Sequence, residues 1–115
     1  MPWPIRILDE KPAWDDVKVG DAWWLSPHDD NWPTPVGTKH RHLTRVLWVA
    51  LPYRDGHYPF CVHSPSTRDG PEGAGWDVTG EAPKITVSPS INIIGSYHGW
   101  IKDGVITDDC EGRKF

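Results

Sequence analysis

Apolar and polar residues alternate over short stretches of this chain, and no apolar pattern of helical period continues for long without a Pro or Gly. Alternation with a period of two is typical of a β-strand that buries one face. Helix is therefore predicted to be a minor component, limited to a turn or single helical turn at 12–16. The predicted strands are residues 5–8, 21–25, 44–51, 58–62, 76–79, 84–88, 97–101 and 105–107.

Turn-forming residues separate these strands. Residues 54–56 and 102–104 each contain an Asp-Gly pair between apolar runs, which favours a hairpin. Segments 26–38 and 64–75 are rich in Pro or Gly and are predicted to be long loops. Pro59 has no N–H to donate to a β-ladder, so its strand is predicted to lie at a sheet edge or to be interrupted there.

These elements predict a mainly β fold with little helix. The architecture would be a small antiparallel sheet, a sandwich or an open barrel, with long Pro/Gly loops between the strands. A chain of 115 residues has the length of one domain, so we expect a single domain over residues 1–115.

Charge and apolar content exclude several classes of partner. Twelve Lys and Arg against sixteen Asp and Glu give a net charge of -4, which leaves no basic field to attract nucleic acid. No apolar run approaches the roughly 18 residues of a membrane span, and the N-terminus lacks the pattern of a secretion signal. A cytoplasmic protein is expected. Cys61 and Cys110 are too few for a disulfide framework, so both are expected to be reduced.

Tryptophan is unusually frequent, with 8 Trp against 2 Phe. A small β domain must build its core from the large apolar residues that it has, so tryptophans within predicted strands are expected to be buried. These are Trp23, Trp48, Trp76 and Trp100.

Three other tryptophans lie near Pro in predicted loops, namely Trp3, Trp14 and Trp32. Exposed tryptophans are frequent anchors of protein–protein interfaces. These three are the candidate binding residues, and a protein is the expected partner.

A metal site is one candidate chemistry. Cys61 and His63 form a C-x-H pair, which in a strand would place both side chains on one face. His98 in a later strand could be a third ligand, with His57 or Cys110 as a fourth. The alternative is a buried Cys61 beside a partly exposed His63 with no metal.

Another close pair of histidines, His40 and His42, would likewise share one face of a strand.

Nucleophilic catalysis is a second candidate chemistry. Ser88, Ser90 and His98 could be combined with Asp77 or Asp103, but no catalytic sequence motif requires this combination. The Ser-Pro-Ser segment at 88–90 is more simply interpreted as the end of a strand, because Pro89 interrupts the ladder. The spacing therefore identifies no reaction class.

The C-terminal half also resembles a known family. The segments 75–80 (GWDVTG), 83–91 (PKITVSPSI) and 97–105 (YHGWIKDGV) carry the resemblance. They are similar to small uncharacterised proteins of actinobacterial phages, and to a related branch that is encoded beside bacterial ubiquitin-like conjugation genes. The resemblance covers roughly 47–105.

That related branch is regarded as zinc-binding, and the resemblance implies ligands in this chain. Cys61 and His63 stand where the branch has its first two cysteines, and His98 stands at its histidine. Pro65 and Gly95 occupy the places of two further cysteines. The resemblance thus implies either no cofactor or zinc at a degenerate site, open to water because ligands are missing.

Two functions from different classes follow. The first is a small non-catalytic interaction module, a phage-type accessory protein in the host cytosol that acts through protein–protein contacts. The alternative is a metal-dependent, peptidase-like hydrolase that uses Cys61, His63 and His98 as ligands. We expect the binding module.

His98 is singled out by both the residue pattern and the resemblance. It lies two residues from Trp100, so the two side chains should share one face, and burial of Trp100 would turn His98 inward. A buried imidazole needs partners for both nitrogens. We expect these partners to come from the Ser-Pro-Ser segment or a neighbouring backbone group rather than from a metal.

Overall fold

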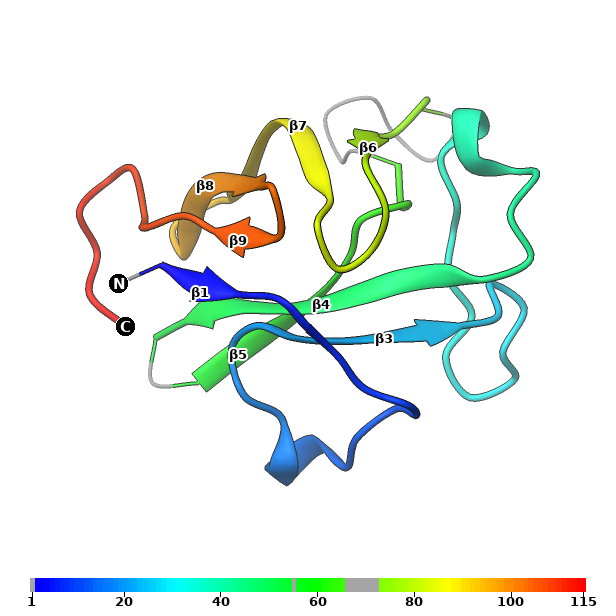
Figure 1. The fold of residues 1–115 in the computed structure, drawn as a ribbon, viewed down its shortest axis with the longest axis horizontal. Helices are drawn as coiled ribbons and strands as arrows, with labels where there is room; N and C mark the ends of the chain where they lie inside the picture. Colours follow the sequence, from blue (N-terminus) through cyan, green and yellow to red (C-terminus); the bar gives the residue numbers. More distant parts are fainter. Residues whose placement is uncertain (1, 55, 66–72) are drawn as a thin grey trace.

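The protein is described by a computed structural model that covers residues 2–54, 56–65 and 73–115. Over these residues the chain forms nine strands and two 3-10 turns, and no α-helix (Figure 1). The strands are β1 (Trp3–Pro4), β2 (Arg6–Ile7), β3 (Asp21–Leu25), β4 (Val46–Tyr53), β5 (Gly56–Cys61), β6 (Asp77–Thr79), β7 (Thr86–Ile93), β8 (Tyr97–Lys102) and β9 (Val105–Ile106), and the turns are η1 (Trp14–Asp16) and η2 (Thr38–His40).

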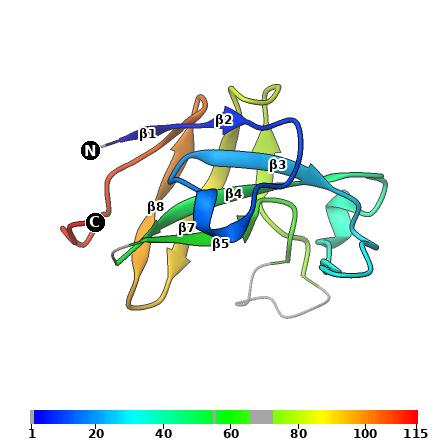
Figure 2. The same ribbon diagram turned by 90° about the horizontal axis from the view of Figure 1, so that it is seen from below.

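The strands form two sheets. The five-stranded sheet has the order β1-β9-β8-β7-β6 and is antiparallel throughout. The four-stranded sheet has the order β2-β3-β4-β5, with β2 parallel to β3 and the other pairs antiparallel. Only Ile5 separates β1 from β2, so the chain passes from one sheet to the other at this point, as Figure 2 shows.

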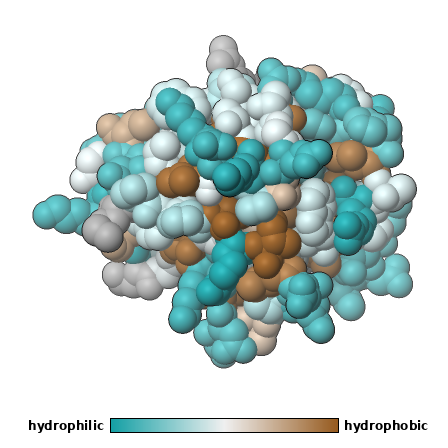
Figure 3. Space-filling view, viewed as in Figure 1, coloured by the Kyte–Doolittle hydropathy of each residue, from teal (hydrophilic) through white to brown (hydrophobic). Residues whose placement is uncertain are grey.

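The inner faces of the two sheets pack against each other and form the hydrophobic core. Alternate residues of each strand point to the same face, so every second side chain enters the core. The buried residues are Leu47, Val49, Leu51 and Phe60 from the four-stranded sheet, and Val87, Ile91, Tyr97, Ile101 and Ile106 from the five-stranded sheet. Apolar side chains also gather near the middle of the face in Figure 3, where the two sheets meet in Figure 1.

The predicted mainly β fold is confirmed, and so are both hairpins. The β4–β5 turn places Arg54 in the left-handed region (φ 47), and the β8–β9 turn does the same with Asp103 (φ 47) and Gly104 (φ 78). Pro59 lies in β5, an edge strand, where its missing N–H removes no ladder hydrogen bond. No helix among the described residues has the length and apolarity to cross a membrane.

The interpretation of the Ser-Pro-Ser segment as a strand end is wrong. β7 continues through it, and the register against β8 shifts between Val87 and Ile91. Val87 pairs with Ile101 and Ile91 with Gly99, so residues 88–90 face a single residue of β8. A bulge of this kind leaves its residues outside the regular ladder, so Pro89 is accommodated without ending the strand.

Burial of the strand tryptophans is only partly as predicted. Trp23 is buried, with 3% of its surface exposed. Trp48, Trp76 and Trp100 are only half-buried, so the prediction for these three is wrong. The residues next to Trp48 and Trp100 in sequence occupy the core, so period-two alternation places these two rings on the outer faces of their sheets.

Candidate functional site

The outer face of the five-stranded sheet carries a connected group of polar side chains around His98. The imidazole Nδ1 lies 2.8 Å from Oε1 of Glu111, and Nε2 lies 3.1 Å from Oγ of Ser90. Ser90 belongs to the β7 bulge, whereas Glu111 follows β9 in the C-terminal segment. Three segments of the chain thus meet at one ring.

His98 shares a face with Trp100, as predicted, and the two rings stack with centroids 6.2 Å apart and planes at 25°. The expected partial burial of His98 is confirmed, with 27% of its side chain exposed, but the prediction that this face turns inward is wrong, because Tyr97 and Ile101 enter the core instead. The expectation that the Ser-Pro-Ser segment supplies a partner for His98 is confirmed by the contact with Ser90.

The carboxylate of Asp109 holds the C-terminal segment against β8. Its side chain is fully buried (0% exposed) and accepts a hydrogen bond from the backbone N–H of His98 at 2.9 Å. It also accepts hydrogen bonds from the backbone N–H of Glu111 at 2.7 Å and from the guanidinium of Arg113 at 2.9 Å. Asp109 therefore fixes the position of Glu111 relative to His98.

The acids that the sequence suggested for this group lie elsewhere. Asp77 pairs with the ammonium of Lys39 at 2.6 Å, and Asp103 lies in the β8–β9 turn. Glu111 supplies the carboxylate instead. It lies thirteen residues after His98 and beyond another strand, so no local spacing could have identified it.

The predicted zinc ligands are not brought together. Cys61 is the last residue of β5 and His63 follows in a turn, while His98 lies in the other sheet with both ring nitrogens engaged. Within the described ranges, no group of three His, Cys, Asp or Glu side chains could hold a metal ion. Because β5 ends at Cys61, the period-two argument that put His63 on the same face no longer applies.

Among the described residues the other metal candidates do not complete a site, although the ring of His40 contacts that of His63, with centroids 4.8 Å apart. His57 is the second residue of β5 and contacts Trp14, and Cys110 is exposed in the C-terminal segment. Nε2 of His40 lies 2.7 Å from the backbone oxygen of Trp76. The residues present therefore do not fit a zinc site.

Burial sets the protonation of Cys61 and His63. Desolvation raises the pKa of the Cys61 thiol to about 12, although the backbone N–H groups of His63 and Ser64 act in the opposite direction. Desolvation, together with the smaller effects of the charges of His40 and His42, lowers the pKa of His63 to about 4. Cys61 is therefore a neutral thiol, and His63 a neutral imidazole, at neutral pH.

The low pKa of His63 predicts acid sensitivity. Nδ1 of His63 accepts a hydrogen bond from the backbone N–H of Leu47 (3.1 Å), so protonation at this nitrogen would also break that bond. An unfolded histidine binds a proton near pH 6.5 and the folded one only near pH 4, so stability should fall between these values. The free energy of unfolding should fall by an amount on the order of 3 kcal/mol, because each unit of the pKa difference is worth about 1.4 kcal/mol.

Urea unfolding of the parent and of His63→Gln between pH 4 and pH 7 tests this prediction. The variant should be less stable at neutral pH but should lose less stability on acidification, because Gln does not titrate. Equal pH dependence in the two proteins would show that other groups cause the acid sensitivity.

The three candidate binding tryptophans differ in exposure. Trp14 is 52% exposed and its ring lies against His57, with centroids 4.5 Å apart. Trp32 is half-buried, with its edge on Trp48 at 5.6 Å. Trp3 is half-buried beside Phe115 at 6.4 Å, so of the three only Trp14 is largely exposed.

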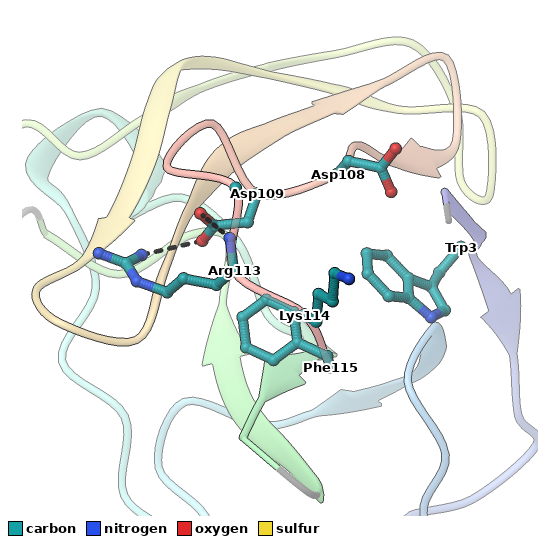
Figure 4. Close-up of a pocket in the computed structure, with 7 residues that line it drawn as sticks. Trp3, Asp108, Asp109, Arg113, Lys114 and Phe115 are labelled. Carbon is teal, nitrogen blue, oxygen red and sulfur yellow. Dashed lines mark hydrogen bonds and ion pairs between the residues drawn. The ribbon is translucent and has the colours of Figure 1, made fainter.

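Trp3 lines a pocket of about 340 Å³ formed with the C-terminal segment (Figure 4). The lining residues are Trp3, Asp108, Asp109, Gly112, Arg113, Lys114 and Phe115. In Figure 4 the ion pair between Asp109 and Arg113 lies on one side of the pocket and the ring of Trp3 on the other, with Lys114 and Phe115 between them.

Three buried ring nitrogens have no hydrogen-bond partner within the described part of the chain: Nε1 of Trp23, Nε1 of Trp48 and Nδ1 of His57. The register pairs Trp23 with Trp48, and it pairs His57 with Pro52, four residues further along β4. All three side chains therefore lie on the outer face of the four-stranded sheet. Buried polar atoms without a hydrogen-bond partner are rare in proteins.

Comparisons with known proteins identify no relative: no family model matches the sequence, and neither a curated protein nor a solved structure matches the chain.

Proposed function

We propose that the protein is an interaction module that binds an extended protein segment on the outer face of its four-stranded sheet. We call the surface formed by Trp14, Trp32, Trp48 and His57 the aromatic face. The observation that carries the proposal is the exposure of Trp14, which keeps about half of its surface (52%) in contact with solvent. Exposed tryptophans of this kind are typical interface anchors.

The segment that crosses this face links its aromatic rings. The ammonium of Lys11 lies 4.3 Å from the ring of Trp32, and Trp14 lies on His57. Rigid aromatic rings side by side offer grooves for prolyl rings, and ring N–H groups can donate to the carbonyls of an extended peptide.

Charge indicates the composition of the bound segment. Asp15 and Asp16 follow Trp14 in the same 3-10 turn, and both are exposed. The whole chain carries a net charge of -4. Complementary charge steers association and selects partners, so the preferred segment contains Arg or Lys as well as Pro.

The resemblance over 47–105 supports a place among the accessory proteins of actinobacterial phages, which would act in the host cytosol. That family has no settled activity, so the partner chemistry proposed above rests on the aromatic face alone. The metal-dependent hydrolase is not proposed, because Cys61, His63 and His98 do not converge.

Titration with a synthetic peptide that contains several prolines flanked by arginines tests the module. We expect saturable binding, followed by tryptophan fluorescence, and a weakening of about tenfold or more in Trp14→Ala, as for an interface anchor. A peptide with Glu in place of Arg should bind more weakly.

The matched control is Ile94→Ala, which removes another exposed apolar side chain (88% exposed) from the turn between β7 and β8. It should bind like the parent. Absence of saturable binding, or equal affinity of the parent and Trp14→Ala, would contradict the proposed function.

A further inference from the structure

We propose that Ser90, His98 and Glu111 form a nucleophilic site that accepts acyl groups from carboxylic esters, with Ser90 as the nucleophile. The site lies on the outer face of the five-stranded sheet, whereas the aromatic face lies on the outside of the other sheet. This inference is independent of the proposed function, because no residue is shared between the two surfaces.

The hydrogen bonds fix the tautomer of His98. An ionised carboxylate only accepts hydrogen bonds, so the 2.8 Å contact with Glu111 requires the proton on Nδ1. In the neutral imidazole Nε2 is then the unprotonated nitrogen, and it lies 3.1 Å from the hydroxyl of Ser90. Ser90 therefore donates its hydrogen bond to a base that is correctly oriented to take its proton.

The surrounding structure holds each member of the group in place. Asp109 accepts hydrogen bonds from the backbone N–H groups of both His98 and Glu111. It therefore holds the imidazole of His98 and the carboxylate of Glu111 in position relative to each other. The ring of Trp100 stacks on the imidazole, with centroids 6.2 Å apart. The indole N–H of Trp76 lies 3.4 Å from the backbone oxygen of Ser90, which steadies the bulge.

The bulge in β7 determines how the hydroxyl of Ser90 is presented to solvent. Residues 88–90 face a single residue of β8, so the hydroxyl is presented outside the regular ladder. Bulges occur frequently beside active sites because they redirect a side chain. The side chains of His98 and Glu111 are 27% and 47% exposed, so an ester can approach from solvent.

The chemistry balances with the ester and water alone. Oγ of Ser90 attacks the carbonyl carbon while Nε2 of His98 takes the hydroxyl proton, and the C–O bond to the alcohol breaks as that proton passes to the leaving oxygen. The acyl group is then bound to Ser90. Water attacks this ester with His98 again as base, and the acid and the free serine are released.

An activated fluorophosphonate, followed by peptide mapping, tests the nucleophile directly. We expect one label per chain on Ser90, with loss of the fluoride, and an initial burst of about one equivalent of nitrophenol from p-nitrophenyl acetate. Ser90→Ala should show neither. The control is Ser88→Ala, which removes an exposed serine two positions earlier in the same strand and should react like the parent.

The roles of the other two residues are separated by labelling kinetics. His98→Gln should slow labelling about 100-fold, as expected for loss of a general base. Glu111 is a positioning residue, and Glu111→Gln should lower the maximal labelling rate about tenfold without changing the reagent concentration that gives half of it. A purely structural role would not lower the maximal labelling rate while leaving the half-saturating reagent concentration unchanged.

The far-ultraviolet circular dichroism and unfolding midpoint of each variant show whether it is folded. Failure of the parent to react, labelling at another serine, or equal labelling of the parent and the folded Glu111→Gln and His98→Gln variants would overturn the proposal. In that case the three residues would form a structural link between the C-terminal segment and the sheet.

Discussion

Tyr97→Ala should lower the free energy of unfolding by about 3–5 kcal/mol, the range for removing a large ring from a core. Tyr97 is fully buried and belongs to the hydrophobic core between the two sheets. Its hydroxyl donates to the backbone oxygen of Thr107 at 2.7 Å. The substitution removes the ring, opens a cavity and leaves this oxygen without its donor.

Urea unfolding monitored by fluorescence measures the change, with Tyr97→Phe as the matched control. Phe keeps the ring and loses only the hydroxyl, so it should cost about 1–2 kcal/mol. The difference in the free energy of unfolding between the two variants gives the cost of removing the ring and opening the cavity. If Tyr97→Ala cost no more than Tyr97→Phe, the assignment of this ring to the core would be wrong.

Asp109→Ala is expected to be similarly destabilising, by about 3–5 kcal/mol at neutral pH, the range for breaking a buried ion pair. The fully buried carboxylate pairs with Arg113 and accepts backbone N–H groups of His98 and Glu111. Its removal leaves these donors without their acceptor. Unfolding by guanidinium chloride measures the loss, and Asp30→Ala in an exposed loop should change stability by less than about 0.5 kcal/mol.

The same carboxylate should make stability depend on pH. Desolvation raises the pKa of Asp109, but hydrogen bonds from the backbone of His98, Glu111 and Arg113 and from the guanidinium of Arg113 lower it more, so the net shift is downward. The folded state then binds this proton less readily than the unfolded state. The stabilisation by the Asp109 carboxylate is complete above the ordinary pKa of an aspartic acid. It is lost as the pH falls through the lower pKa that Asp109 has in the folded protein.

Asp109→Asn separates charge from hydrogen bonding. Asn retains one oxygen acceptor but does not titrate, so the variant should be intermediate in stability at neutral pH and less sensitive to acid. Parent-like acid sensitivity in this variant would assign the pH dependence to other carboxylates.

The sequence alone was sufficient for the class of fold and for much of its local structure. Period-two alternation predicted most of the strands, and the Asp-Gly pairs at 54–56 and 102–104 predicted the two hairpins, because turn chemistry acts between neighbouring residues. The missing N–H of Pro59 predicted an edge strand for the same kind of local reason. The sequence also grouped Ser90 with His98, although it offered several acids and gave no reason to prefer the combination.

Only the tertiary structure decided which face of each strand is buried. Alternation shows that His98 and Trp100 share a face, but whether that face is inside depends on which side of the sheet packs against the other sheet. The wrong expectation for Trp48 and Trp100 has this cause. The bulge at residues 88–90 likewise depends on register with β8, which no single strand specifies.

The candidate sites depend on tertiary contacts in the same way. Cys61 ends β5 and His63 follows it in a turn, whereas His98 lies in β8 of the other sheet, so the predicted ligands are separated by the two packed sheets. Glu111 reaches His98 because the buried carboxylate of Asp109 folds the C-terminal segment back onto β8. Contacts between distant segments form only when the sheets pack, and for this reason the sequence determined the strands while the packing of the sheets determined the site.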